Sequence, residues 1–106
     1  MVVDNEAVSK IIKSYVADVK KNMHIDKAYL YGSYAKDNQH QDSDIDICFF
    51  SSDFEGQRSV DVLTRLIGLT RGYKSVDIEP RVFPTSEIDM GNPFVDEVLK
   101  TGREIL

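Results

Sequence analysis

Apolar residues recur at helical spacing in three stretches of this chain, so we expect three amphipathic helices. The first covers Asn5–Asn22, and the second covers residues 58–70, with Gly72 as its stop. The third begins at Asn92-Pro93, which suit an N-cap and a first helical position, and it runs through Lys100. The second helix has its apolar positions at Val60, Leu63, Leu66 and Ile67, and the third is expected to bury Phe94, Val95, Val98 and Leu99.

Three other stretches have the composition of β-strands, namely Lys27–Tyr31, residues 44–50 and residues 75–83. Alternation along residues 44–50 sends successive side chains to opposite faces of the sheet. The expected core face carries Ile45, Ile47 and Phe49, and the opposite face carries Asp44, Asp46, Cys48 and Phe50. Because Pro80 has no N–H to donate, the third strand is predicted to lie at an edge or to contain a bulge.

The elements follow the order helix, strand, strand, helix, strand, helix, and residues 103–106 are a candidate for a short last strand. This order predicts an α/β or α+β fold, in which helices pack on a small mixed β-sheet. A chain of 106 residues is expected to form a single domain, residues 1–106.

Composition and charge limit the kinds of partner and the cellular compartment that we expect for this protein. The net charge of −5 and the pI of about 4.9 argue against direct binding to nucleic acid. No apolar run approaches the roughly 18 residues of a membrane span, and the first residues lack a signal-peptide pattern. We therefore expect a cytoplasmic protein that makes no membrane contact. Cys48 is the only cysteine, and its apolar neighbours predict a buried, inert thiol.

Candidate chemistry is concentrated between the first two predicted strands. Gly32 lets the backbone approach a phosphate closely, and Ser33 adds a hydroxyl and an N–H. Asp44 and Asp46 share one strand face, where two carboxylates about 6–7 Å apart repel by roughly 2–3 kcal/mol at an effective dielectric of 20. A hard cation such as Mg²⁺ or Mn²⁺ would offset that repulsion. The pattern indicates nucleotide chemistry.

Gly32-Ser33, ten further residues and Asp44-Ile45-Asp46 together resemble the core motif of the DNA polymerase β nucleotidyltransferase superfamily. More narrowly, the stretch resembles the minimal nucleotidyltransferases, whose mark is Gly-Ser and Asp-x-Asp at this spacing. Lys36 stands where that family usually has arginine, and Asp37 stands where it often has glycine. An additional acid at Asp37 would either weaken nucleotide affinity or face solvent.

The resemblance implies a role for each motif residue. Asp44 and Asp46 would bind Mg²⁺ or Mn²⁺, and a third carboxylate would come from the third strand. Glu79 and Asp77 lie on the same face of that strand, so either could be the third carboxylate. We prefer Glu79, because it stands in the string Ile78-Glu79-Pro80 that matches one branch of these proteins. Asp77 remains the alternative.

The same resemblance implies that Gly32 and Ser33 hold the nucleotide phosphates, with Lys36 either an added charge contact or a loop lysine that faces solvent. The reaction would be attack of an acceptor hydroxyl on the α-phosphate of a nucleoside triphosphate, with ATP as the expected donor of AMP and pyrophosphate as the leaving group.

Minimal nucleotidyltransferases also suggest a partner, a small helical protein of the HEPN type in a toxin–antitoxin pair. In that arrangement the enzyme modifies a tyrosine of the toxin with AMP. The alternative is a non-catalytic antitoxin that neutralises the HEPN toxin by contact. A polymerase-like activity is disfavoured by the acidic charge balance.

Overall fold

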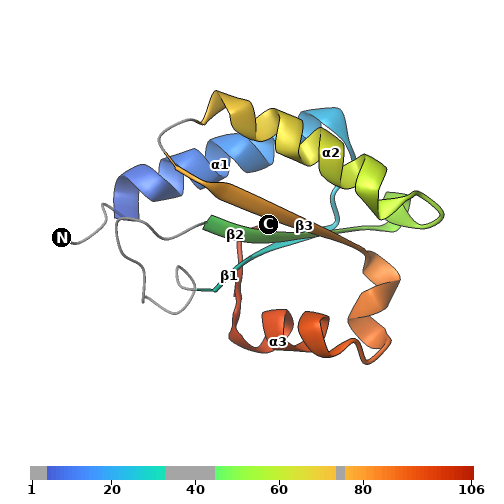
Figure 1. The fold of residues 1–106 in the computed structure, drawn as a ribbon. Helices are drawn as coiled ribbons and strands as arrows, with labels where there is room; N and C mark the ends of the chain where they lie inside the picture. Colours follow the sequence, from blue (N-terminus) through green and yellow to red (C-terminus); the bar gives the residue numbers. More distant parts are fainter. Residues whose placement is uncertain (1–4, 33–44, 74–75) are drawn as a thin grey trace.

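The computed structural model describes residues 5–32, 45–73 and 76–106, which form a four-stranded sheet with helices on both faces (Figure 1). The helices and strands are α1 (Asn5–Asn22), β1 (Lys27–Tyr31), β2 (Ile45–Ser51), α2 (Ser59–Leu69), β3 (Ile78–Pro84), α3 (Pro93–Thr101) and β4 (Arg103–Glu104). Short 3₁₀ turns follow β2, α2 and β3 at Ser52–Phe54, Thr70–Gly72 and Thr85–Asp89. The predicted order of elements and the α/β class are confirmed.

The strands are arranged in the order β3-β2-β1-β4. The pairs β1–β2 and β1–β4 are antiparallel, whereas β2–β3 is parallel, so the sheet is mixed as predicted. The β3 strand lies at an edge, which is where a strand containing Pro80 can be accommodated without losing a ladder hydrogen bond.

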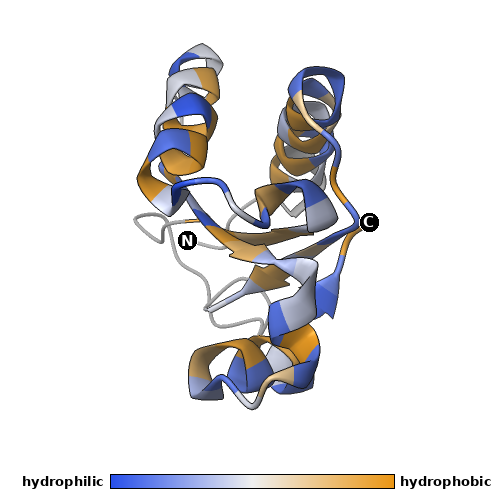
Figure 2. Ribbon diagram, turned by 90° about the vertical axis from the view of Figure 1, so that its right-hand side faces the viewer, coloured by the Kyte–Doolittle hydropathy of each residue, from blue (hydrophilic) through white to orange (hydrophobic). Residues whose placement is uncertain are grey.

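One face of the sheet forms the main core with α1 and α2 (Figures 1 and 2). Ile45, Ile47 and Phe49 are fully buried there, which confirms the predicted core face of β2. The buried Tyr15 hydroxyl of α1 donates a hydrogen bond of 2.9 Å to the Leu66 carbonyl of α2, so the two helices are joined by a polar contact inside the apolar layer.

A second core fills the space between the opposite face and α3 (Figure 2). Cys48 and Phe50 are fully buried there beside Val95 and Val98. The ring of Phe50 lies 6.1 Å from the Phe83 ring, centroid to centroid, in a stacked arrangement. Alternation along β2 was expected to give one core face. The docking of α3 also buries the part of the opposite face that carries Cys48 and Phe50.

Three apolar side chains that helical spacing grouped with the buried ones are exposed. Val60 and Ile67 of α2 are 53% and 49% exposed, because Val62 and Leu66 provide the face of that helix that packs on the sheet. Phe94 of α3 was expected to be buried and is 39% exposed, because it follows the N-cap and lies at the rim of the second core.

Most element bounds agree with the sequence prediction. Helix α1, strand β1 and the Asn92 N-cap of α3 are where they were expected, and the Asn92 side chain accepts hydrogen bonds from the N–H groups of Phe94 and Val95. Strand β3 begins at Ile78 rather than at residue 75, although the Asp77 carbonyl already accepts a 2.7 Å hydrogen bond from the Ile45 N–H. None of the described helices is long and apolar enough to cross a membrane.

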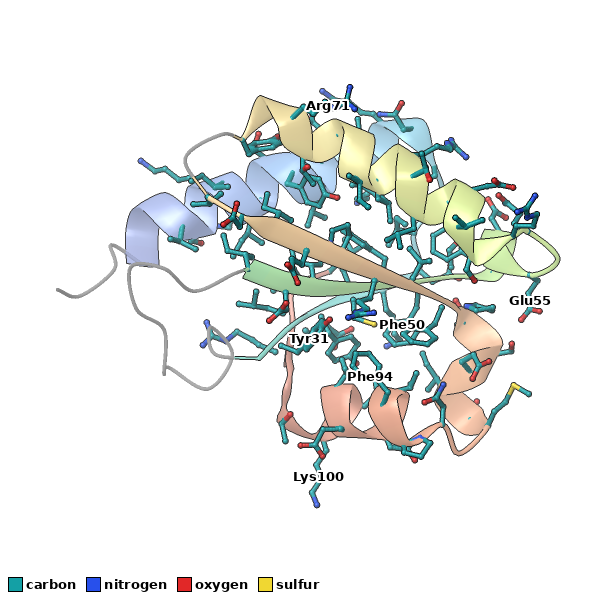
Figure 3. All side chains as sticks on the ribbon, in the orientation of Figure 1. Tyr31, Phe50, Glu55, Arg71, Phe94 and Lys100 are labelled. Carbon is teal, nitrogen blue, oxygen red and sulfur yellow. The ribbon has the colours of Figure 1, made fainter. Side chains whose placement is uncertain are left out.

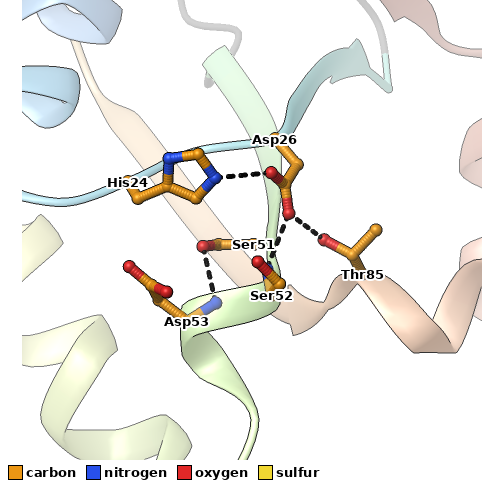
Figure 4. Close-up of polar contacts among 6 residues, drawn as sticks. All are labelled: His24, Asp26, Ser51, Ser52, Asp53 and Thr85. Carbon is orange, nitrogen blue, oxygen red and sulfur yellow. Dashed lines mark hydrogen bonds and ion pairs between the residues drawn. The ribbon is translucent and has the colours of Figure 1, made fainter.

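A polar junction built around Asp26 closes the end of the sheet where β1 begins (Figure 4). Its carboxylate accepts hydrogen bonds from the Thr85 hydroxyl at 2.7 Å, the Ser52 N–H at 2.7 Å and the His24 ring at 2.6 Å. These bonds lower the pKa of Asp26 from 3.8 to about 2. Tyr31 and Gly32 lie at the opposite end of β1.

Candidate functional site

Three of the predicted site residues come together at the end of the sheet opposite Asp26. Asp46 of β2 is paired with Tyr31 of β1 on one side and with Glu79 of β3 on the other. Gly32 follows Tyr31 directly and lies against the Asp46 carboxylate. The other predicted residues, Ser33, Lys36 and Asp44, lie outside the described residues, so their roles stay predictions.

Gly32 is required here by its conformation and by its surroundings. Its φ angle is +72°, in the left-handed region that glycine adopts without steric cost. A Cβ atom built on Gly32 would lie 2.5 Å from Oδ2 of Asp46. Gly56 and Gly91 have φ angles of +75° but open space around the same position. Only at Gly32, among these three, does the missing side chain make room for a carboxylate.

Asp46 and Glu79 are neighbours across the parallel β2–β3 pair, so their side chains leave the sheet on the same face. Asp46 is half-buried and Glu79 is exposed. Asp77 has the same alternation as Glu79 but precedes the strand, and it is also exposed. Of the two candidates for the third carboxylate, Glu79 is thus the one whose strand register places it beside Asp46.

Within the part of the chain that the structure describes, no group of three or more histidine, cysteine, aspartate or glutamate side chains gathers as a metal site. Two neighbouring carboxylates supply hard oxygen ligands of the kind that Mg²⁺ and Mn²⁺ prefer. The donor chemistry of Asp46 and Glu79 therefore fits a divalent cation, with room in the ligand set for a further carboxylate and water.

Sequence reasoning missed a cluster of Arg81, Tyr31 and Phe94 on the same face. Arg81 lies two residues after Glu79, so alternation along β3 was the signal that could have identified it. Its guanidinium lies close enough to the Tyr31 hydroxyl to oppose the increase in the pKa of Tyr31, and it lies 5.9 Å from the centre of the Phe94 ring. The Tyr31 and Phe94 rings meet edge-to-face at 5.6 Å (Figure 3).

The surroundings of Tyr31 and Cys48 set their protonation. Burial raises the pKa of Tyr31 to about 12, the nearby Asp46 charge adds to the increase, and the nearby Arg81 opposes it. Burial likewise raises the pKa of Cys48 to about 12, with the positive charge of Arg81 opposing. Both groups are therefore neutral at physiological pH, and the prediction of a buried Cys48 is confirmed.

Two solved structures share this fold. A candidate nucleotidyltransferase from Sulfolobus solfataricus superimposes with a TM-score of 0.69 at 23% identity, over 90% of this chain and 76% of that one. A second candidate nucleotidyltransferase gives a TM-score of 0.57 at 24% identity, over 92% of this chain and 97% of that one. A comparison with curated proteins finds no match.

The sequence itself matches the family described as "Polymerase beta, Nucleotidyltransferase" over residues 10–106, which begin within α1 and include every later element through β4. That match covers the motif between β1 and β2 as well as the strand that carries Glu79. The chain therefore belongs to the polymerase β nucleotidyltransferase family.

Proposed function

We propose that this protein is a metal-dependent nucleotidyltransferase that transfers AMP from ATP to a hydroxyl acceptor. The observation that carries the proposal is the row of neighbours at one sheet end, in which Asp46 lies between Glu79 and the Gly32 turn. Two carboxylates beside a glycine turn combine oxygen ligands for a cation with a stretch of backbone that a phosphate can approach.

Asp46 and Glu79 would hold Mg²⁺ or Mn²⁺, with Asp44 as the further ligand that the motif predicts. Such a cation neutralises charge on the phosphates and on the departing pyrophosphate. Gly32 and Ser33 would hold the β- and γ-phosphates through N–H groups and the hydroxyl, and Lys36 would add a charge contact. The choice of ATP comes from the resemblance to minimal nucleotidyltransferases.

In the proposed reaction the acceptor oxygen forms a bond to the α-phosphorus as the bond from that phosphorus to pyrophosphate breaks. One of the site carboxylates accepts the proton of the hydroxyl. The acceptor that the resemblance favours is a tyrosine of a HEPN-type toxin, which would make this protein its antitoxin.

The test is transfer of label from α-labelled ATP, with Mg²⁺, to the product of the neighbouring gene, which the proposal expects to be a HEPN-type protein. Asp46→Asn and Glu79→Gln should each reduce labelling by about two orders of magnitude or more, the range expected for loss of a positioned acid–base or metal-binding group. Asp61→Asn and Glu97→Gln make the same chemical changes on exposed residues of α2 and α3 and should have no effect.

Asp77→Asn decides between the two candidates for the third carboxylate, because full activity in this variant supports Glu79. Transfer that persists in Asp46→Asn would refute the proposed chemistry. Neutralisation of the toxin by Asp46→Asn, with no labelling by either wild type or variant, would instead indicate an antitoxin that acts by contact alone.

A further inference from the structure

Arg81 places a positive charge on the same sheet face as the two carboxylates. It is the register partner of Cys48, in the row next to Asp46 and Glu79. Strands lie about 4.8 Å apart and rise about 3.3 Å per residue, so the Cα atoms of Asp46 and Arg81 are separated by roughly 8 Å. An arginine side chain is long enough to cover that distance.

Two neutral groups hold the guanidinium away from its own strand. The Phe94 ring lies beside it at 5.9 Å, and the Tyr31 hydroxyl lies near enough for the guanidinium to influence its pKa. Phe94 is itself fixed by Tyr31 and by Phe83, whose ring centre is 5.6 Å away. Neither contact is anionic, and the Phe94 ring provides a face on which the guanidinium can rest.

The direction of this side chain indicates which ligand it serves. Arg81 begins on β3, and its guanidinium reaches Tyr31 on β1, the residue immediately before Gly32. It thus leans over β2 toward the glycine turn where the proposed function places phosphates. A planar guanidinium with several N–H donors suits phosphate oxygens, which it can bind in pairs.

We propose that Arg81 is a nucleotide-binding residue that donates hydrogen bonds to a phosphate oxygen of the bound nucleoside triphosphate, held in position by Phe94 and Tyr31. This inference rests on the proposed function and adds a residue that the motif does not contain. It also predicts opposite effects on two ligands, because a guanidinium beside the carboxylates attracts a polyphosphate and repels a divalent cation.

The test compares binding of Mg²⁺ alone with binding of ATP in the presence of Mg²⁺, by titration calorimetry at low salt. Arg81→Gln should weaken ATP binding about tenfold or more, the size of a hydrogen bond to a charged group. The same variant should tighten Mg²⁺ binding by up to about fivefold, the effect of removing a unit charge roughly 8 Å from a divalent ion in water.

Two further variants make the test specific. Arg71→Gln removes the same charge from the opposite side of the sheet, beside α2 (Figure 3), and should change neither affinity. Arg81→Lys keeps the charge but loses the planar fork, so Mg²⁺ affinity should stay at the wild-type value while ATP affinity falls.

The outcomes separate this inference from the function on which it rests. If wild type binds ATP and Arg81→Gln binds it equally well, Arg81 is not a phosphate ligand and the proposed function stands. A loss of both affinities in Arg81→Gln would show a merely structural role and overturn the inference. If wild type binds no ATP, both the inference and the proposed function are wrong.

Discussion

Replacing Gly32 by alanine tests the geometry of the candidate site most directly. The new Cβ would lie 2.5 Å from Oδ2 of Asp46, whereas a relaxed contact between such atoms needs more than 3 Å. The carboxylate oxygen belongs to a rotatable side chain, so we expect it to turn away rather than push the backbone apart. Gly32→Ala should therefore displace the ligand atom while the fold persists.

The stability cost has one main source. An alanine held at a φ of +72° costs about 1–2 kcal/mol, because its Cβ crowds the neighbouring carbonyl oxygen. For a domain of this size, each kcal/mol lowers the melting temperature by about 4–8 °C. Gly56→Ala is the matched control, since Gly56 has a φ of +75° and a Cβ added there would meet no atom within 4 Å. The two variants should lose similar stability.

Cation binding should distinguish the two variants. Mg²⁺ that binds the folded protein raises its melting temperature according to its affinity, and that shift should survive in Gly56→Ala and shrink in Gly32→Ala. Asp46→Ala should abolish the shift, and adding Gly32→Ala to it should then change nothing further. Equal Mg²⁺-induced shifts in Gly32→Ala and Gly56→Ala would refute the reasoning, because the carboxylate would then be unaffected by the added Cβ.

Three further predictions concern the scaffold. The pKa of Asp26 is lowered to about 2, so its carboxylate stabilises the fold fully above about pH 4 and less as the pH falls toward 2. In urea titrations, the difference in unfolding free energy between wild type and Asp26→Asn should therefore shrink from about pH 4 to about pH 2. A difference that does not depend on pH would contradict this prediction. Tyr15→Phe removes the buried hydrogen bond to Leu66 and should lower the free energy of unfolding by about 1 kcal/mol, whereas no change would show that the bond makes no net contribution. Phe50→Ala empties the second core and should cost about 3–5 kcal/mol by guanidinium denaturation, and a loss below about 1 kcal/mol would mean that α3 packs independently of it.

Local signals in the sequence were sufficient for most of the fold. Short stretches of sequence were enough to predict helix α1 from its helical period, the start of α3 from Asn92-Pro93, and the edge position of β3 from the missing N–H of Pro80. Each of these predictions was correct. The exposure of Val60 and Ile67 was not predicted, because helical spacing alone does not say how wide a stripe the sheet will cover.

The candidate site depends instead on strand register, which no single segment contains. Strands β2 and β3 are joined through α2, so neither strand reveals that Asp46 faces Glu79 or that Cys48 faces Arg81. Register also explains why one face of the β2–β3 pair is apolar at one end and acidic at the other. Its rows run from Phe50 with Phe83, through Cys48 with Arg81, to Asp46 with Glu79.

Along those rows the face changes from a core covered by α3 to an acidic, partly open end, and the arginine lies at the boundary between them. The guanidinium of Arg81 at that boundary can contact the apolar layer through Phe94 and still act electrostatically on the carboxylates. The face that alternation assigned to Asp46, Cys48 and Phe50 is thus divided by the docking of α3. The proposed chemistry uses the end of this face that α3 leaves open and the arginine at its boundary. Substitutions at Gly32, Asp46, Glu79 and Arg81 should therefore alter ligand binding, while those at Phe50 should alter stability.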